Sequence, residues 1–297
     1  MSDARPVVYP DATEPLRDRT RAALADAELA GNLRAAGASW GASRARVAAE
    51  NPFAEMRLRA REIRRGDIRD LPILLERLER NVRAAGGTVV RAADATAACR
   101  YITDLAAARG ASLVAKSKSM ATEEIKLNEA IEEAGLRVVE TDLGEWILQL
   151  AGQHPSHIVA PAVHLNKDQV RAVLEAEGGH PLPSDREALV AHARVRLREV
   201  FASADIGISG VNFAVAETGT VCVVENEGNA RLVTALPRIH VAVMGMERVV
   251  RDWDEAAHIL QVLPMAAIGD DAAGYVNLIT GPRAADEADG PLSLIHI

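Results

Sequence analysis

Two lysines close together in the sequence could bind an anion. Lys116 and Lys118 stand in "AKSKSM" (115–120), and they are two of only four lysines in a chain with 34 basic residues. Ser117 and Ser119 add hydroxyls, at the point where a predicted strand ends and a helix begins near Thr122. Backbone N–H groups at a helix start and ammonium groups are typical of a phosphate or carboxylate site. The alternative is a solvated turn with a serine cap.

Acidic residues gather at the end of the next predicted strand, in "ETDLGEW" (140–146). Glu140, Asp142 and Glu145 lie within six positions of one another, and Gly144 allows close backbone approach. We expect one of these carboxylates to pair with Lys116 or Lys118 across neighbouring strands. Capping of the following helix is an equally good explanation for acids at this position.

Three histidines follow in "HPSHIVAPAVH" (154–164). The spacing of His154, His157 and His164 matches no zinc-binding pattern, so we predict no metal site. His157 and His164 are candidates for acid–base catalysis or substrate contact, because histidine titrates near neutral pH. Structural hydrogen bonding is the alternative role.

A later segment, "AETGTVCVVENEGNAR" (216–231), predicts a β-hairpin and a polar loop. Glu217 and Glu225 flank its second strand and are candidate catalytic carboxylates. The candidate ligand-binding positions are the turn residues Thr218, Gly219 and Thr220 and the loop residues Asn226, Glu227, Gly228 and Asn229. The loop is either an ordinary turn or one wall of a cleft opposite the lysines.

The elements that must position these side chains alternate between short apolar runs and helical patterns. Strands are predicted over 88–93, 111–116, 136–141 and 156–162, with helices over 94–110, 122–135, 143–152 and 166–179. This alternation is typical of βαβ units, so we predict a Rossmann-like α/β fold with a parallel or mixed sheet and flanking helices. Ligands of such folds bind beyond the carboxyl ends of the strands.

The chain divides into three predicted regions. Residues 1–65 form an N-terminal arm and helices rich in Ala, Arg and Glu, and residues 66–282 form the α/β domain. Residues 283–297 form a polar linker and a tail. The final "LSLIHI" is also the translation of a common sequencing-library transposon end, which predicts a non-native tail and a natural protein that continues past Pro291. The alternative is a native C-terminal strand.

Composition excludes several classes of protein. A net charge of −8 argues against nucleic-acid binding, which usually requires a basic face. The sequence shows neither a signal-peptide h-region nor an apolar run long enough to span a membrane, so a cytoplasmic location is predicted. Cys99 and Cys222 stand far apart in apolar settings and are predicted to be buried thiols.

The long runs around these motifs resemble a known family. Residues 115–164, beginning "AKSKSMATEEIKLNEA", and residues 204–250, beginning "ADIGISGVNFAVAETGTVCVVENEGNAR", are similar to the lactate utilization protein B family, whose N-terminal part is the LUD domain. The resemblance covers roughly residues 10–290. It implies a fold related to ribose-phosphate isomerases and CoA-transferases. It also implies electron transfer, with two partner lactate utilization proteins, in the oxidation of L-lactate to pyruvate.

The resemblance further implies a C-terminal region with two [4Fe–4S] clusters, and the sequence departs from the family there. Two isolated cysteines cannot supply the four thiolates of one cluster, so no cofactor is expected in this chain. Three hypotheses follow. The chain is the LUD part of a lactate-oxidising protein with a small-anion pocket, a stand-alone CoA-transferase or sugar-phosphate isomerase with Glu217 or Glu225 as nucleophile or base, or a non-catalytic scaffold.

Overall fold

The computed structural model describes residues 16–283 and 293–296, so the predicted arm before residue 16 lies outside the described residues. Its helices are α1 Leu16–Ala25, α2 Ala27–Glu50, α3 Phe53–Arg69, α4 Leu71–Ala84, α5 Ala95–Ala108, α6 Met120–Glu124, α7 Leu127–Glu133, α8 Leu143–Ala151, α9 Lys167–Gly178, α10 Arg186–Ser203, α11 Asn229–Ala235 and α12 Trp253–Ala267, with a 3₁₀ turn at Met246–Arg248. Its strands are β1 Thr88–Val89, β2 Leu113–Lys116, β3 Arg137–Glu140, β4 Ile206–Gly210, β5 Phe213–Val215, β6 Thr220–Glu225, β7 Ile239–Val243, β8 Val249–Val250, β9 Tyr275–Ile279 and β10 Ser293–His296.

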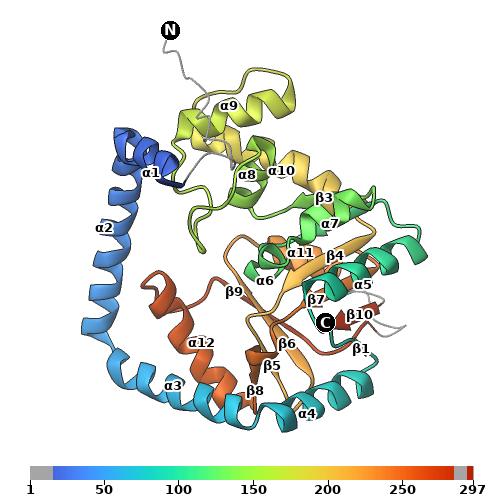
Figure 1. Cartoon of the computed structure of the whole chain (residues 1–297). Coiled ribbons are helices and arrows are strands. Elements are labelled where there is room, and N and C mark those ends of the chain that lie inside the picture. The colour runs from blue at the N-terminus through green and yellow to red at the C-terminus, as the bar shows by residue number, and fades with distance from the viewer. Residues whose placement is uncertain (1–15, 284–292, 297) are drawn as a thin grey trace.

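The main sheet has six parallel strands in the order β1-β10-β7-β4-β2-β3 (Figure 1). Alternate residues of β2 face opposite sides of it, as the pleat of a strand requires. Val114 packs with α5 and α7 on one face, while Leu113 and Ala115 pack with α8, α9 and α10 on the other. The predicted α/β fold with a parallel sheet and flanking helices is therefore confirmed.

A second, mixed sheet has the order β8-β5-β6-β9. Strands β5 and β6 are the predicted antiparallel hairpin, which is confirmed, with Phe213 opposite Cys222. Helix α4 covers one face of this sheet through Leu74, Leu78 and Val82, and α12 covers the other.

The first helices run along the border of the molecule and are joined to its body (Figure 1). Helix α3 lies against α12. Arg46 of α2 donates a hydrogen bond to the carbonyl of Gly269 at 3.2 Å, and Asn32 donates one to the carbonyl of His164 at 3.1 Å. The predicted boundary at residue 65 falls inside α3.

Two local predictions are wrong. Residues 156–162 are turns rather than a strand, because Ser156 bonds the carbonyl of Pro161 through both its N–H and its hydroxyl, closing a local loop. The predicted helix over 122–135 is two helices, since Lys126 takes a left-handed φ of 55° between α6 and α7. Strand β10 lies between β1 and β7, within the segment predicted as a tail.

Candidate functional site

A buried ion pair joins the carboxyl ends of β2 and β3. These strands run parallel with Lys116 opposite Glu140, so both side chains leave the sheet on the same face. The Lys116 ammonium donates a hydrogen bond to Glu140 Oε1, and both side chains are almost completely buried. The predicted pairing of a lysine with a carboxylate across neighbouring strands is confirmed.

Further carboxylates and an amide surround this pair and complete a polar cluster. We call it the strand-end cluster, and its members are Lys116, Glu123, Asn128, Glu140 and Glu145. The Asn128 side-chain amide donates to Glu140 Oε1 at 2.8 Å. One side-chain oxygen on each of Glu123, Asn128, Glu140 and Glu145 is buried without a hydrogen-bond partner. Glu123 and Glu145 also share a side-chain hydrogen bond, which requires a proton on one of the two carboxyl groups, so the cluster has more acceptors than donors.

The clustered charges change how the acids titrate. Burial raises the pKa of Glu145 to about 8, and the nearby carboxylates of Glu123 and Glu140 add to the shift. Burial also raises the pKa of Glu123, although the Lys116 ammonium opposes that change. Glu145 therefore holds a proton at neutral pH, and the cluster can donate or accept one.

In the rest of the lysine loop, Ser117 and Ser119 are buried and Lys118 is half-buried. Ser119 caps α6 by accepting the Thr122 N–H at 3.3 Å, and the Ser117 N–H donates to the Ile208 carbonyl at 2.9 Å. The Lys118 ammonium donates to the Val159 carbonyl at 2.8 Å. The Lys118 ammonium thus has further N–H donors that this hydrogen bond does not use.

The "ETDLGEW" segment combines both expected roles. Asp142 caps α8 by accepting the N–H groups of Gly144 at 3.1 Å and Glu145 at 3.2 Å. A side chain at Gly144 would meet Pro161 at 3.1 Å, so glycine allows the histidine loop to approach. Capping therefore accounts for Asp142, while Glu140 and Glu145 belong to the strand-end cluster.

The loop over 226–229 lies beside this segment. The Glu227 carboxylate accepts the Leu143 N–H at 3.0 Å, and the Asn229 amide donates to the Thr141 hydroxyl at 3.3 Å. Gly228 takes a φ of 82° in the turn that includes Asn226. Glu225 accepts the first N–H groups of α11, so its carboxylate serves as a helix cap.

The turn over 217–220 lies at the opposite end of β6 from Glu225 and contacts α4. The Asn81 amide donates to the Glu217 carbonyl at 2.9 Å, and a side chain at Gly219 would meet the Val82 nitrogen at 2.5 Å. The Thr218 and Thr220 hydroxyls bond each other at 2.7 Å. The structure thus separates Glu217, Thr218, Gly219 and Thr220 from the lysine loop by the length of a strand.

The histidines anchor the loop between α8 and α9. His164 is buried between the Ser156 hydroxyl at 2.6 Å and the Gln153 side-chain oxygen at 3.1 Å, and burial lowers its pKa. His157 stacks on Trp40 with ring centroids 4.5 Å apart, and its Nδ1 accepts the Val159 and Ala160 N–H groups. These contacts are structural, while His154 is exposed.

Sequence reasoning missed two members of the strand-end cluster, Glu123 and Asn128. Their positions depend on the break at Lys126, which brings α6 and α7 back over the end of the sheet. The available signal was three acids and an amide in "TEEIKLNEA" (122–130), next to the lysine loop. Among the residues that the structure describes, no group of three His, Cys, Asp or Glu side chains is arranged to hold a metal ion.

The fold and the site together define a doubly wound α/β protein with a buried lysine–carboxylate cluster at the carboxyl ends of neighbouring parallel strands. A sequence model of the LUD domain matches residues 75–294 of this chain. The chain belongs to the LUD domain family.

Several known proteins are similar to this chain. Lactate utilization protein B of Shouchella clausii is 48% identical over 238 residues, which are 80% of this chain and 50% of that protein. The "Uncharacterized electron transport protein YkgF" of Escherichia coli K12 is 46% identical over 252 residues, which are 84% of this chain and 53% of that protein. The chain thus spans about half the length of these relatives. A crystal structure of a duf162 family protein from Deinococcus radiodurans is 17% identical, covers 68% of this chain and 96% of its own, and has a TM-score of 0.29, too low to support an argument.

Proposed function

We propose that this chain is the LUD part of a longer electron-transfer protein that takes part in oxidising L-lactate to pyruvate. The observation that carries the proposal is the 48% identity, over 80% of this chain, to a protein named lactate utilization protein B. The name of the E. coli relative supports the electron-transfer role. On this proposal the protein works with the other two lactate utilization proteins in the cytoplasm. No helix in the described ranges is long and apolar enough to cross a membrane.

Iron–sulfur clusters do not fit the residues that the structure describes. Cys99 packs in the core beside the main sheet, while Cys222 packs in the core beneath α12. Both thiols are buried, and they lie in different cores. On this proposal the two [4Fe–4S] clusters belong to the remaining half of the full-length protein, and the LUD part contributes ligand binding and proton handling.

The lysine loop and the strand-end cluster divide the work on a small anionic ligand. Lys116 is already neutralised by Glu140, so on this proposal Lys118 provides the ammonium that holds the ligand. Glu145 carries a proton at neutral pH and acts as the proton donor or acceptor of the site. The stand-alone enzyme hypothesis receives less support, because Glu225 caps α11 and Glu217 lies at the other end of the hairpin.

A gene chimera tests this function. Residues 16–283 replace the matching half of lactate utilization protein B in a strain that lacks its own copy. We expect growth on L-lactate to return, together with lactate-dependent dye reduction in extracts. The matched control carries Arg194→Gln, which changes an exposed residue of α10.

The outcomes separate the hypotheses. A chimera that accumulates in soluble form without restoring growth refutes the proposal. If Lys118→Met combined with Glu145→Gln leaves the restored growth unchanged, the LUD part is a scaffold rather than a ligand site. Turnover of a CoA ester or sugar phosphate by the purified chain supports the stand-alone enzyme instead.

A further inference from the structure

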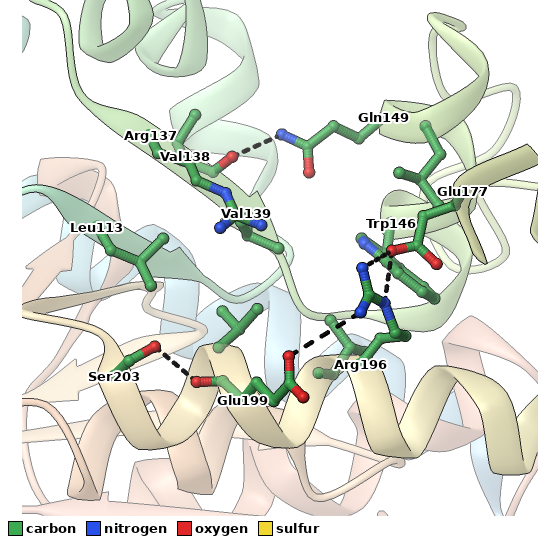
Figure 2. A pocket seen from close by; sticks show the side chains of 13 residues that line it. Leu113, Arg137, Val138, Val139, Trp146, Gln149, Glu177, Arg196, Glu199 and Ser203 are labelled. Carbon is green, nitrogen blue, oxygen red and sulfur yellow. Dashed lines mark hydrogen bonds and ion pairs between the residues drawn. The ribbon is translucent and has the colours of Figure 1, made fainter. Parts of the chain in front are cut away.

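A separate cleft lies at the outer edge of the main sheet, beside β3 (Figure 2). It has a volume of about 320 Å³ and is enclosed by β3, α8, α9 and α10. Leu113, Val139, Leu197 and Val200 give it an apolar floor, and the Trp146 ring forms one wall. Leu113 and Arg137 begin β2 and β3, whereas the strand-end cluster stands at the other end of the same strands. The cleft is therefore distinct from the site described above.

The edge of β3 is closed to a further strand. The Gln149 side-chain amide donates to the Val138 carbonyl at 3.0 Å, and its oxygen accepts the Glu140 N–H at 3.0 Å. The side chain thus occupies the outward-facing peptide groups that an added strand would use. Since this edge is blocked and the space beside it is small, the cleft fits a small molecule better than a peptide strand.

The rim carries one guanidinium that is not committed to a partner. Arg196 of α10 donates to Glu177 at 2.6 Å, and Glu177 also bonds His192. Arg137 of β3 has no side-chain hydrogen bond or ion pair in the part of the chain that the structure describes. The other acid that lines the cleft is Glu199, whose carboxylate is 4.0 Å from the Arg196 guanidinium.

We propose that this cleft binds a small organic monoanion with an apolar body. The carboxylate of the ligand pairs with Arg137, because a guanidinium matches a carboxylate in a bidentate geometry. The body of the ligand lies on the aliphatic floor beside Trp146. The volume of the cleft is near the lower end of the usual range for ligand pockets, so the proposed ligands are aryl or short acyl carboxylates.

Helix α8 connects this cleft to the strand-end cluster. Glu145 lies in the cluster, while Trp146 and Gln149 line the cleft, and Gln149 holds the backbone N–H of Glu140. A ligand packed against Gln149 is therefore expected to reduce the opening of that hydrogen bond. The amide of Glu140 should exchange more slowly with deuterium when the cleft is filled.

The experiment uses the 297-residue chain with 4-phenylbutyrate as the probe and its uncharged analogue 4-phenylbutanamide as the control ligand. Binding is measured by competition with anilinonaphthalene sulfonate fluorescence and by hydrogen exchange across residues 137–150. We expect the acid to displace the dye and the amide to do so at least about tenfold more weakly. Exchange at Glu140 should slow in the presence of the acid.

Variants locate the binding. Arg137→Leu should weaken the binding of 4-phenylbutyrate by about tenfold and leave the binding of 4-phenylbutanamide unchanged. Arg194→Gln on α10 should change the affinity for neither ligand. Ser203→Trp adds bulk at the exposed rim and should abolish the binding of both ligands, and circular dichroism verifies that this variant folds. Displacement that is equal for acid and amide, or that survives both Arg137→Leu and Ser203→Trp, overturns the proposal.

Discussion

Replacing Lys116 by methionine tests the central electrostatic feature of the site. Methionine keeps an unbranched apolar chain and removes the ammonium, which leaves the Glu140 carboxylate 3% exposed with the Asn128 amide as its remaining side-chain donor. Breaking a buried ion pair on one side costs about 3–5 kcal/mol, because the remaining charge is uncompensated. We expect Lys116→Met to lower the free energy of unfolding by that amount at pH 7.

The double variant Lys116→Met, Glu140→Leu separates charge from packing. It removes both charges of the pair, and such replacements are often neutral or stabilising. We expect it to be more stable than Lys116→Met alone, despite the second change. Urea unfolding followed by circular dichroism measures both variants, and unchanged slopes would show that the denatured state is comparable.

The same substitution has an effect on titration. Lys116 lowers the pKa of Glu145 and of Glu123, so its loss should raise both, and carbon-13 NMR of the carboxyl groups measures the change. The reasoning fails if Lys116→Met costs less than about 1 kcal/mol and the double variant is no more stable than Lys116→Met alone. That result would mean that water compensates the Glu140 charge.

Three further predictions concern the surrounding frame. Burial raises the pKa of Asp67 to about 7, so the folded state binds its proton more tightly than the unfolded chain does. Stability then falls as pH rises from about 4 to about 7, and Asp67→Asn should make that decline in urea midpoints shallower, while the raised pKa values of Glu145 and Glu227 account for the remainder. Parallel pH curves for the variant and the parent chain would contradict this prediction. Gly219→Ala should lower the thermal midpoint by the equivalent of about 1–3 kcal/mol, since φ is +78° and the new methyl group meets Val82. Trp40→Ala should speed hydrogen exchange over residues 152–166, because the ring that holds His157 is lost, and unchanged exchange would argue against that role.

The architecture could be predicted from the sequence where local pattern and tertiary structure agree. The alternation of apolar runs and helical patterns between residues 88 and 152 corresponds to β1 through α8, with the carboxyl ends of β2 and β3 side by side. Strand β4 was not predicted because "IGISG" contains two glycines, which weaken a strand signal. The structure explains both, since a side chain at Gly207 would meet the Val233 carbonyl at 1.9 Å and one at Gly210 would meet the Ser119 hydroxyl at 2.6 Å.

The site could be predicted only in part, for a physical reason. Pairing between Lys116 and Glu140 follows from parallel strands in register, which a sequence pattern can indicate. The positions of Glu123 and Asn128 depend on one left-handed residue, Lys126, at a position where continuous helical periodicity favoured a single helix. Long-range side-chain contacts of this kind leave no periodic signal.

The structure assigns different environments to the two lysines that looked alike in the sequence. Lys116 faces carboxylates and is held by Glu140, while Lys118 points to a backbone carbonyl at Val159, on the loop that Trp40 anchors through His157. An anion next to Lys116 would have to compete with a buried carboxylate, which is why the proposed function places the anionic group at Lys118. The unpartnered oxygens of the cluster, in contrast, call for hydrogen-bond donors. Under the proposed function, a ligand that satisfies both halves would carry an acidic group at one end and a hydroxyl or a proton to share at the other.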